Sequence, residues 1–207
     1  ATIGDDTKTA LSDGKKVVWT KGDKVDVFNA DGTTAEFSTS IEEPAAEATF
    51  TGNLAPDYYA SKLYAIYPTR GVNATYNKET GIITSVRIAG DQIATAGSFD
   101  KAYAVAVGEA ALAPNPEFTF TNIHALFKFT IAGDAPSSVT LSNKGIAMIA
   151  GTATYNVNEK KTTVTGGAGS VTLAGTFETG KTYYIATYAF TTPGLSIKFD
   201  GVEVDTV

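Results

Sequence analysis

The sequence contains no cysteine and only one histidine, one tryptophan and one methionine. Without cysteine the chain can form no disulfide, no thiolate nucleophile and no cysteine-based zinc site. With His124 as the only histidine, a two-histidine metal site cannot form, and a Ser-His-Asp triad would depend on that single residue. Several common kinds of catalytic and metal centre are therefore excluded.

Positive charge is also scarce. Charged residues make up 18% of the chain, and the net charge is -6. Nucleic-acid binding requires many basic side chains to neutralise phosphates, so we expect no nucleic-acid partner. No apolar run approaches the ~20 residues that span a bilayer, and the N-terminus lacks the regions of a signal peptide. We expect either a cytosolic protein or the mature form of an exported one whose leader is absent here.

Strand-forming residues and turn signals dominate what is present. The chain has 20 glycines and 43% hydrophobic residues, with abundant threonine, valine and aromatics. Turn signals recur at intervals typical of a sandwich or barrel, roughly every 8–12 residues. No stretch sustains the 3.6-residue apolar period of a helix. The sequence therefore predicts an all-β protein.

Residues 117–132 (EFTFTNIHALFKFTIA) form the longest run of strand-forming residues. Phe118 and Phe120 share one parity, whereas Ile123, Phe127 and Ile131 share the other. Strand side chains alternate between faces, so the change of parity predicts a bulge, a bend or a change of sheet. Because two prolines precede this run and a new series of strands follows, we predict an N-terminal domain over residues 1–121 and a C-terminal domain over 122–207.

The same patterns predict individual strands. Residues 15–19 and 25–28 flank a TKGD turn and are predicted to form a hairpin. Further strands are expected at residues 62–67, 82–88, 102–107, 138–141, 146–149, 152–157, 161–165, 170–173, 182–190, 195–199 and 202–204.

One motif suggests nucleotide binding. Residues 175–182 (GTFETGKT) match the phosphate-loop pattern, with Gly175, Lys181 and Thr182 at positions that the pattern defines. That chemistry requires a helix to begin at the lysine, so that its first amides cradle the phosphate. Here the aromatic and β-branched run YYIATY follows instead. We therefore expect no nucleotide, and interpret the segment as a β-hairpin with Thr179 and Gly180 in its turn.

Other candidate residues also favour structural roles. His124 shares its strand face with Lys128 and Thr130, and no nucleophile motif accompanies it. Glu42, Glu43 and Glu178 lie in predicted loops or near turns, where a solvated carboxylate is the default. The sequence thus predicts no catalytic, cofactor-binding or metal-binding residues, and we expect no enzyme. The tyrosines of residues 58–76 and 183–188 could form an exposed row that stacks sugars, although core packing is the commoner arrangement.

Several segments together resemble the fimbrillin (type V pilin) family of Bacteroidia-type bacteria. They follow one another along nearly the whole chain: TKTAL at residues 7–11, VWTKGDKVDVF at 18–28, YAIYP at 64–68, FTFTNIHALFKF at 118–129, IAGT at 149–152 and GKTYYI at 180–185.

The resemblance implies two tandem transthyretin-like β-sandwich domains. It also implies a precursor exported as a lipoprotein, trimmed by an arginine-specific protease and polymerised at the outer membrane surface as a pilus. Subunits of this family join other copies by donating a strand to a groove in a neighbour. Family members usually continue beyond a segment like residues 195–199. The resemblance therefore implies either a short member of the family, or a truncated chain, or a C-terminal sandwich that is completed by a partner strand.

The expected donated strand is the last segment of the chain: Val202, Glu203, Val204, Asp205, Thr206 and Val207. The final three residues also resemble a short acceptor of bacterial O-glycosylation, with Thr206 as the modified residue. The resemblance leaves a stalk, tip or anchor subunit open. The alternative is an adhesin or tip module on the same sandwiches that binds host glycans or proteins.

Overall fold

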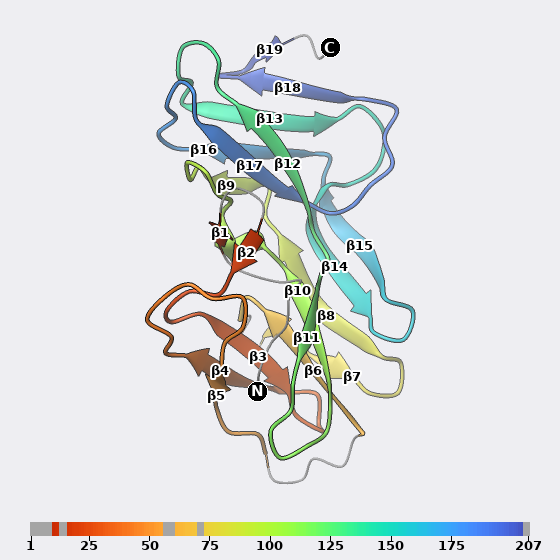
Figure 1. Ribbon diagram of the computed structural model, residues 1–207. Coiled ribbons are helices and arrows are strands. Elements are labelled where there is room, and N and C mark those ends of the chain that lie inside the picture. The colour runs from red at the N-terminus through yellow and green to blue at the C-terminus, as the bar shows by residue number, and fades with distance from the viewer. Residues whose placement is uncertain (1–9, 13–15, 56–60, 70–72, 205–207) are drawn as a thin grey trace. The chain divides into compact units, whose positions relative to one another are not determined.

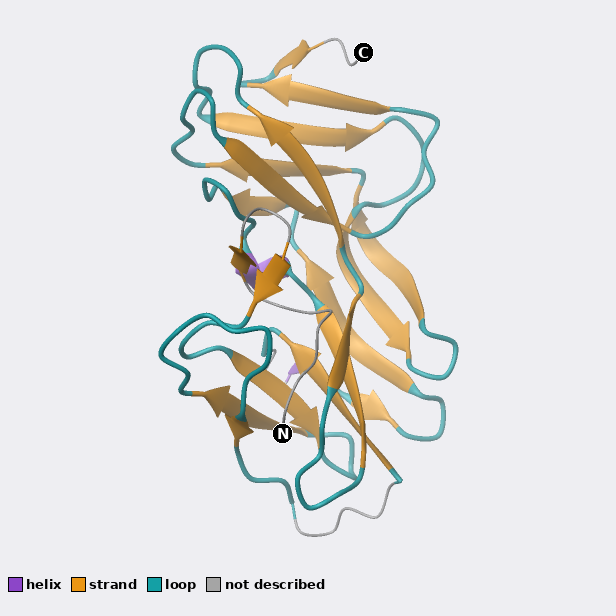
Figure 2. Ribbon diagram, viewed as in Figure 1, coloured by secondary structure: helices purple, strands orange, loops and turns teal. Residues whose placement is uncertain are grey.

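The computed structural model describes residues 10–12, 16–55, 61–69 and 73–204, and most of them lie in β-strands (Figures 1 and 2). No α-helix occurs in these ranges, and a short 3-10 turn, η2 (Lys101–Tyr103), precedes β10. The prediction of an all-β protein is confirmed.

The first ten strands are β1 (Ala10–Ser12), β2 (Lys16–Val18), β3 (Lys24–Phe28), β4 (Thr34–Thr39), β5 (Phe50–Thr51), β6 (Lys62–Tyr67), β7 (Tyr76–Asn77), β8 (Ile82–Ile88), β9 (Asp91–Ile93) and β10 (Ala106–Ala111). The remaining strands are β11 (Thr119–Asn122), β12 (Ala125–Thr130), β13 (Ser138–Asn143), β14 (Ala150–Asn156), β15 (Lys161–Ala168), β16 (Ser170–Ala174), β17 (Thr182–Thr187), β18 (Leu195–Phe199) and β19 (Val202–Val204).

Contacts divide the chain into two compact units. The first consists of residues 1–86, 104–123 and 153–163, and the second of residues 87–103, 124–152 and 164–207. One division falls after Ile123, near the predicted boundary between residues 121 and 122. Residues 87–103 and 153–163 make the two units interleave along the chain, and the two consecutive domains, 1–121 and 122–207, stay a prediction.

A six-stranded antiparallel sheet forms the centre of the first unit. Its order is β11-β10-β6-β3-β4-β5. Strand β6 lies inside the sheet, pairing Tyr64 with Glu109 of β10 and Ala65 with Val27 of β3. Its last five residues are all buried, so apolar material covers both faces. This explains why LYAIY is an unbroken apolar run, whereas a strand buried on one face alternates apolar and polar residues.

Trp19 lies at the centre of the aromatic core on one face of this sheet. Its ring centroid lies 5.0 Å from that of Phe50, 5.4 Å from Tyr67 and 5.6 Å from Phe120, all in edge-to-face geometry. Such pairs are favoured because the positive edge of one ring meets the negative face of another. The buried indole N–H has no hydrogen-bond acceptor among the described residues.

The predicted hairpin of residues 15–19 and 25–28 is wrong. The backbone N–H of Trp19 donates to the carbonyl of Ala45 at 2.8 Å, β2 pairs with β1, and β3 pairs with β4. The intervening turn does form, since the N–H of Asp23 donates to the carbonyl of Thr20 at 3.1 Å. The sequence therefore predicts the turn correctly, but the strands on either side of the turn, β2 and β3, pair with β1 and β4 and not with each other.

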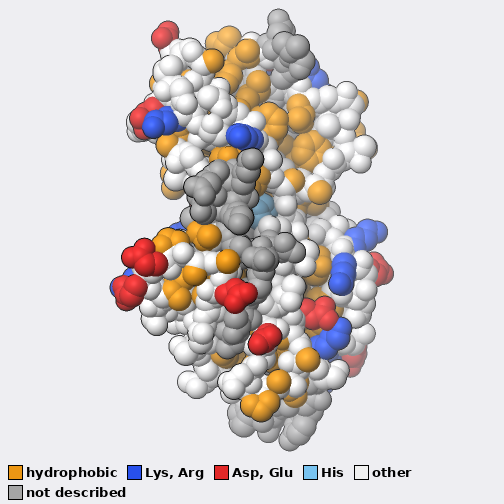
Figure 3. Space-filling model, viewed as in Figure 1, with side chains coloured by type: hydrophobic (Ala, Val, Ile, Leu, Met, Phe, Trp, Pro, Cys, Tyr) orange, Lys and Arg blue, Asp and Glu red, His pale blue; other side chains and the backbone are white. Residues whose placement is uncertain are grey.

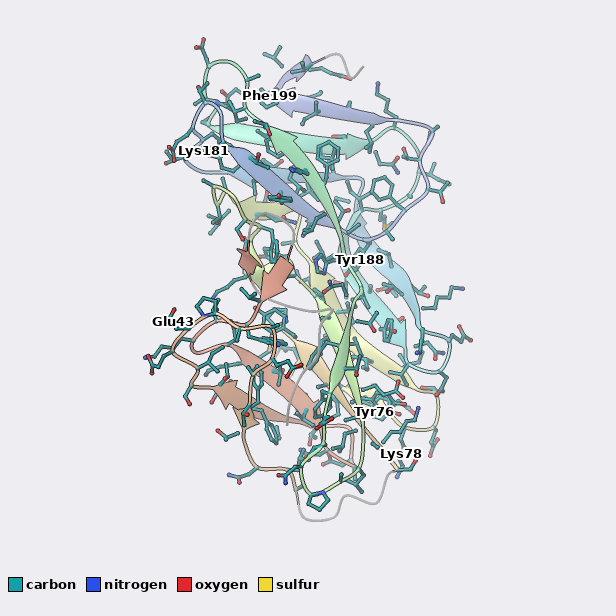
Figure 4. All side chains as sticks on the ribbon, in the orientation of Figure 1. Glu43, Tyr76, Lys78, Lys181, Tyr188 and Phe199 are labelled. Carbon is teal, nitrogen blue, oxygen red and sulfur yellow. The ribbon has the colours of Figure 1, made fainter. Side chains whose placement is uncertain are left out.

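The other face of the six-stranded sheet packs against a second layer. Tyr76 of β7 (labelled in Figure 4) lies with its ring centroid 5.1 Å from that of Tyr64 and 5.8 Å from that of Phe28. Strand β7 is the edge of a four-stranded sheet with the order β15-β14-β8-β7. Two facing layers of this kind are the arrangement of a β-sandwich.

The second unit also has two facing layers. Strands β12 and β17 form one, and the order β19-β18-β13-β16-β9 forms the other. Phe129 of β12 contacts Phe199 of β18 edge to face, with centroids 6.4 Å apart. Strand β9 pairs with β16 in parallel, so a segment from the first half of the chain completes this sheet.

The run at residues 117–132 forms two strands in two different sheets. Strand β11 pairs with β10, and β12 pairs with β17. Phe120 is buried on the first strand, and Ile123 and Ile131 are buried around the second, with Phe127 half-buried. The change of sheet predicted from the parity of the apolar residues is confirmed.

Two other strand predictions fail. Residues 102–107 begin with the 3-10 turn, and the strand starts only at Ala106. Residues 146–149 form no strand, and Ile146 is fully exposed. Both segments are rich in apolar residues, which favours a strand, but a strand forms only where a neighbouring segment pairs with the backbone.

Candidate functional site

The predicted donated strand lies at the edge of a sheet. Among the described residues, strand β19 pairs with β18 alone, with Val202 opposite Phe199 and Val204 opposite Ile197. All three residues of β19 are exposed, Val202 by 70% and Val204 by 42%. The strand is therefore held by backbone pairing, with little side-chain burial. Asp205, Thr206 and Val207 lie outside the described residues.

The turn before β19 is firmly built. Asp200 and Gly201 have φ angles of 48° and 82°, as an Asp-Gly hairpin turn requires. The Asp200 carboxylate accepts hydrogen bonds from the Ser137 hydroxyl at 2.7 Å and from the Ser137 and Ser138 amides at 2.9 Å each. These hydrogen bonds, the Ser137 hydroxyl foremost, lower the pKa of Asp200 below its ordinary value.

An apolar groove of about 350 Å³ opens in the first unit. Its floor includes the buried side chains of Phe50, Leu63 and Phe118, and its rim includes Leu112, which is 44% exposed. Strand β5, which contributes Phe50, is one of the two edge strands of the six-stranded sheet in the part of the chain that the structure describes. An open sheet edge beside an apolar groove is the combination that accepts an added strand.

The phosphate-loop match at residues 175–182 connects two sheets. Strand β16 ends at Ala174, and Thr182 begins β17, so a strand stands where phosphate binding requires a helix. A turn does occur, with Gly180 at a φ of 81°. The predicted hairpin is wrong, because β16 and β17 pair in different sheets.

His124 follows β11 and precedes β12. Its half-buried ring lies 6.2 Å from that of Phe99. Among the residues that the structure describes, no three histidine, aspartate or glutamate side chains gather as a metal site would require.

On the face shown in Figure 3, acidic and basic side chains are interspersed. No helix in the described ranges is long and apolar enough to cross a membrane.

The fold is similar to that of a known crystal structure. The matching protein is named a "putative cell adhesion protein" and comes from Bacteroides uniformis ATCC 8492. The match covers 96% of this chain and 77% of that protein, with a TM-score of 0.56 and 20% sequence identity. No protein-family model and no curated protein matches the chain. At this identity, the similarity shows a common fold.

Proposed function

We propose that this protein is a structural subunit of a bacterial surface pilus of the fimbrillin type, without enzymatic activity, located at the outer membrane surface. The motifs that resemble fimbrillins run in order along the chain. The fold shared with a protein named for cell adhesion from a Bacteroides species supports the same reading. The observation that carries the proposal is β19, a short edge strand with exposed valines.

In this proposal, subunits join when β19 and the residues after it leave their own sheet and enter the groove of a neighbour. Val202 and Val204 lie on one face of the strand, because side chains alternate. That face would meet the apolar floor formed by Phe50, Leu63 and Phe118. The backbone of the inserted strand would form hydrogen bonds with the backbone of β5 along one edge.

Burial of the two valines provides the driving force. In the isolated subunit, Val202 and Val204 are exposed by 70% and 42%. Complete burial of a valine or leucine side chain contributes about 1.5–3 kcal/mol relative to full exposure. Because the donor and the groove consist of different residues, the contact is head-to-tail and generates an open filament unless the ring closes.

The experiment is filament assembly by the variant Val202→Asp/Val204→Asp, imaged by negative-stain electron microscopy. We expect filaments from the unaltered chain and none from the variant, since two carboxylates cannot enter an apolar groove without a large desolvation cost. The matched control is Ile146→Asp, which changes another exposed aliphatic side chain of the second unit. The control should assemble normally. Filaments of equal length from the double variant would contradict the proposal.

A second candidate function is adhesion by the subunit itself. The observation that favours it is the name of the similar structure, a "putative cell adhesion protein". An adhesin binds host glycans or proteins, and this function is compatible with a place in a pilus, most directly at the tip.

A further inference from the structure

A second cavity lies in the first unit and shares no lining residue with the apolar groove. It has a volume of about 440 Å³, within the range of about 300–1,000 Å³ typical of small-molecule pockets. Strands β6, β10 and β11 form one wall, and the opposite side is formed by β14 and by the turn that follows it. Polar and aromatic side chains converge here from segments distant in sequence.

Strand register explains this convergence. Glu109 of β10 stands directly opposite Tyr64 of β6 on one side and Thr119 of β11 on the other. Residues directly opposite in a sheet present their side chains on the same face. A phenol, a carboxylate and a hydroxyl therefore form one row across three strands, and Tyr155 of β14 lines the cavity as well.

Two tyrosines give the cavity rigid aromatic walls. Tyr64 is 8% exposed and Tyr155 is 5% exposed. The ring of Tyr64 is held in place by the ring of Tyr76. Burial raises the pKa of both phenols, and the negative charge of Glu109 raises each of them further. Both hydroxyls therefore remain protonated at neutral pH and can donate hydrogen bonds.

The charged groups of the cavity balance one another. Lys62 forms an ion pair with Glu109, whose side chain is 33% exposed. The other two charged lining residues are Glu117 and Lys160, one of each sign. A pocket with two carboxylates and two ammonium groups has no net charge that would select an anion or a cation.

We propose that this cavity binds a neutral, hydroxyl-rich ligand, a single sugar residue of a glycan. A sugar ring offers C–H faces to the tyrosines and hydroxyls that donate to a carboxylate. The Glu109 carboxylate is the acceptor, whereas Lys62 and the two tyrosine hydroxyls are donors to the sugar oxygens. Thr119 and Thr121 at the open side can serve as donor or acceptor.

The site is independent of strand donation. Its lining residues lie on β6, β10, β11 and β14 and in the segments next to β11 and β14, and none of them lines the proposed acceptor groove or belongs to β19, the proposed donor. A pilus subunit without sugar binding and a sugar-binding protein without polymerisation are therefore separable results.

The test is binding of the methyl glycosides of glucose, galactose, mannose and N-acetylglucosamine, followed by saturation-transfer NMR and calorimetry. We expect at least one glycoside to bind in the millimolar range or tighter. Glu109→Gln should weaken that binding by about tenfold to a hundredfold, because a charge-assisted hydrogen bond is lost. Tyr155→Phe, which removes one hydroxyl, should weaken it by about threefold to tenfold.

The matched control is Glu36→Gln, which breaks the exposed ion pair of 2.8 Å between Glu36 and Lys24 in the same sheet. It should leave glycoside binding unchanged, and near-ultraviolet circular dichroism should show that all three variants are folded. The proposal is overturned if no glycoside of the panel binds, or if binding is equally strong in both cavity variants. It is also overturned if a peptide of residues 199–207 occupies the cavity and displaces the sugar.

Discussion

At the scale of single residues, the side-chain amide of Gln92 forms hydrogen bonds with both backbone groups of Ala186, as the backbone of a paired strand would. The side chain is only 3% exposed. Its Nε2 donates to the carbonyls of Ala186 at 2.7 Å and Ala89 at 3.2 Å, and its Oε1 accepts from the N–H of Ala186 at 3.0 Å. One residue of β17 thus has both backbone groups satisfied by a side chain from β9.

Replacement of this amide should be costly. In Gln92→Leu, the N–H and the carbonyl of Ala186 lose their partner in a buried place, and each unsatisfied group costs about 1–3 kcal/mol. We expect the free energy of unfolding to fall by about 2–4 kcal/mol, measured by urea denaturation.

The control is Asn53→Leu, which replaces an exposed amide and should change the free energy of unfolding by less than about 0.5 kcal/mol. Equal stability of the two variants would show that the Gln92 hydrogen bonds contribute nothing to the folded state.

Single residues were the hardest feature to predict from the sequence. Gln92 sits between Asp91 and Ile93, a triplet that resembles an exposed edge, and its burial depends on β17 far along the chain. The row of Tyr64, Glu109 and Thr119 could not be predicted for the same reason, since only the pairing of strands brings the three residues together. Among the tyrosines for which core packing was the commoner expectation, Tyr64, Tyr67 and Tyr183 are buried.

At the scale of elements, Gly167 allows β14 and β15 to approach closely within the second unit. A Cβ on Gly167 would lie 1.8 Å from the carbonyl oxygen of Ala150, whereas a Cβ on the adjacent Gly166 would meet nothing within 4 Å. Neighbouring glycines of one strand therefore have opposite tolerance for a methyl group.

The pair provides its own matched control. Gly167→Ala should destabilise the protein by about 1–3 kcal/mol or more, because the backbone must shift to relieve the overlap. Gly166→Ala should be neutral or slightly stabilising, since alanine restricts the unfolded chain. Thermal unfolding followed by circular dichroism measures both. A lower midpoint for Gly166→Ala than for Gly167→Ala would contradict the close approach.

Acid should loosen the turn that begins β19. The pKa of Asp200 is lowered in the folded protein, so its ionised form contributes stability above the ordinary pKa of an aspartate, about 3.9. That contribution is lost as the pH falls through the lower folded value. An NMR titration of the Asp200 carboxyl should give a pKa below 3.9, and Ser137→Ala should raise it.

The control for this titration is Ser142→Ala, which removes a hydroxyl from β13, the strand that follows Ser137, without a bond to Asp200. It should leave the Asp200 pKa unchanged. An ordinary pKa in the unaltered protein would mean that the hydrogen bonds from Ser137 and Ser138 do not form in solution.

Elements with strong local signals were predictable. The bounds of β6, β8, β18 and β19 agree with the predicted strands, because each alternates or runs apolar between clear turns. The parity change between Phe120 and Ile123 correctly marked a change of sheet. Strand β9 was missed because three residues paired in parallel to a distant strand leave no local pattern. The pairing of Trp19 with Ala45 likewise has no local sequence pattern that predicts it.

At the scale of the whole molecule, local patterns say little about which distant segments share a unit. The turn signals and parity change supported a division near residue 121, and one division of the structure follows Ile123. A division of the chain into two consecutive segments would place residues 87–103 in the first unit and residues 153–163 in the second, whereas the structure places each in the other unit. Their placement depends on pairing such as that of β9 with β16, which forms only in the folded chain.

The central claim is that β19 of one subunit fills the groove of the next. Mixing two defective variants tests it directly. Val202→Asp/Val204→Asp keeps an intact groove, and Leu112→Asp, at the exposed rim of the groove, keeps an intact donor. Each variant alone should be monomeric. A mixture should join once and stop, because the remaining donor and the remaining groove are both defective.

Analytical ultracentrifugation of the equimolar mixture is the decisive measurement. The account predicts a dimer of twice the 21.6 kDa subunit mass, with no larger species, and monomers of 21.6 kDa for each variant alone. A mixture that remains monomeric, or a single variant that still forms polymers, would contradict strand donation through β19.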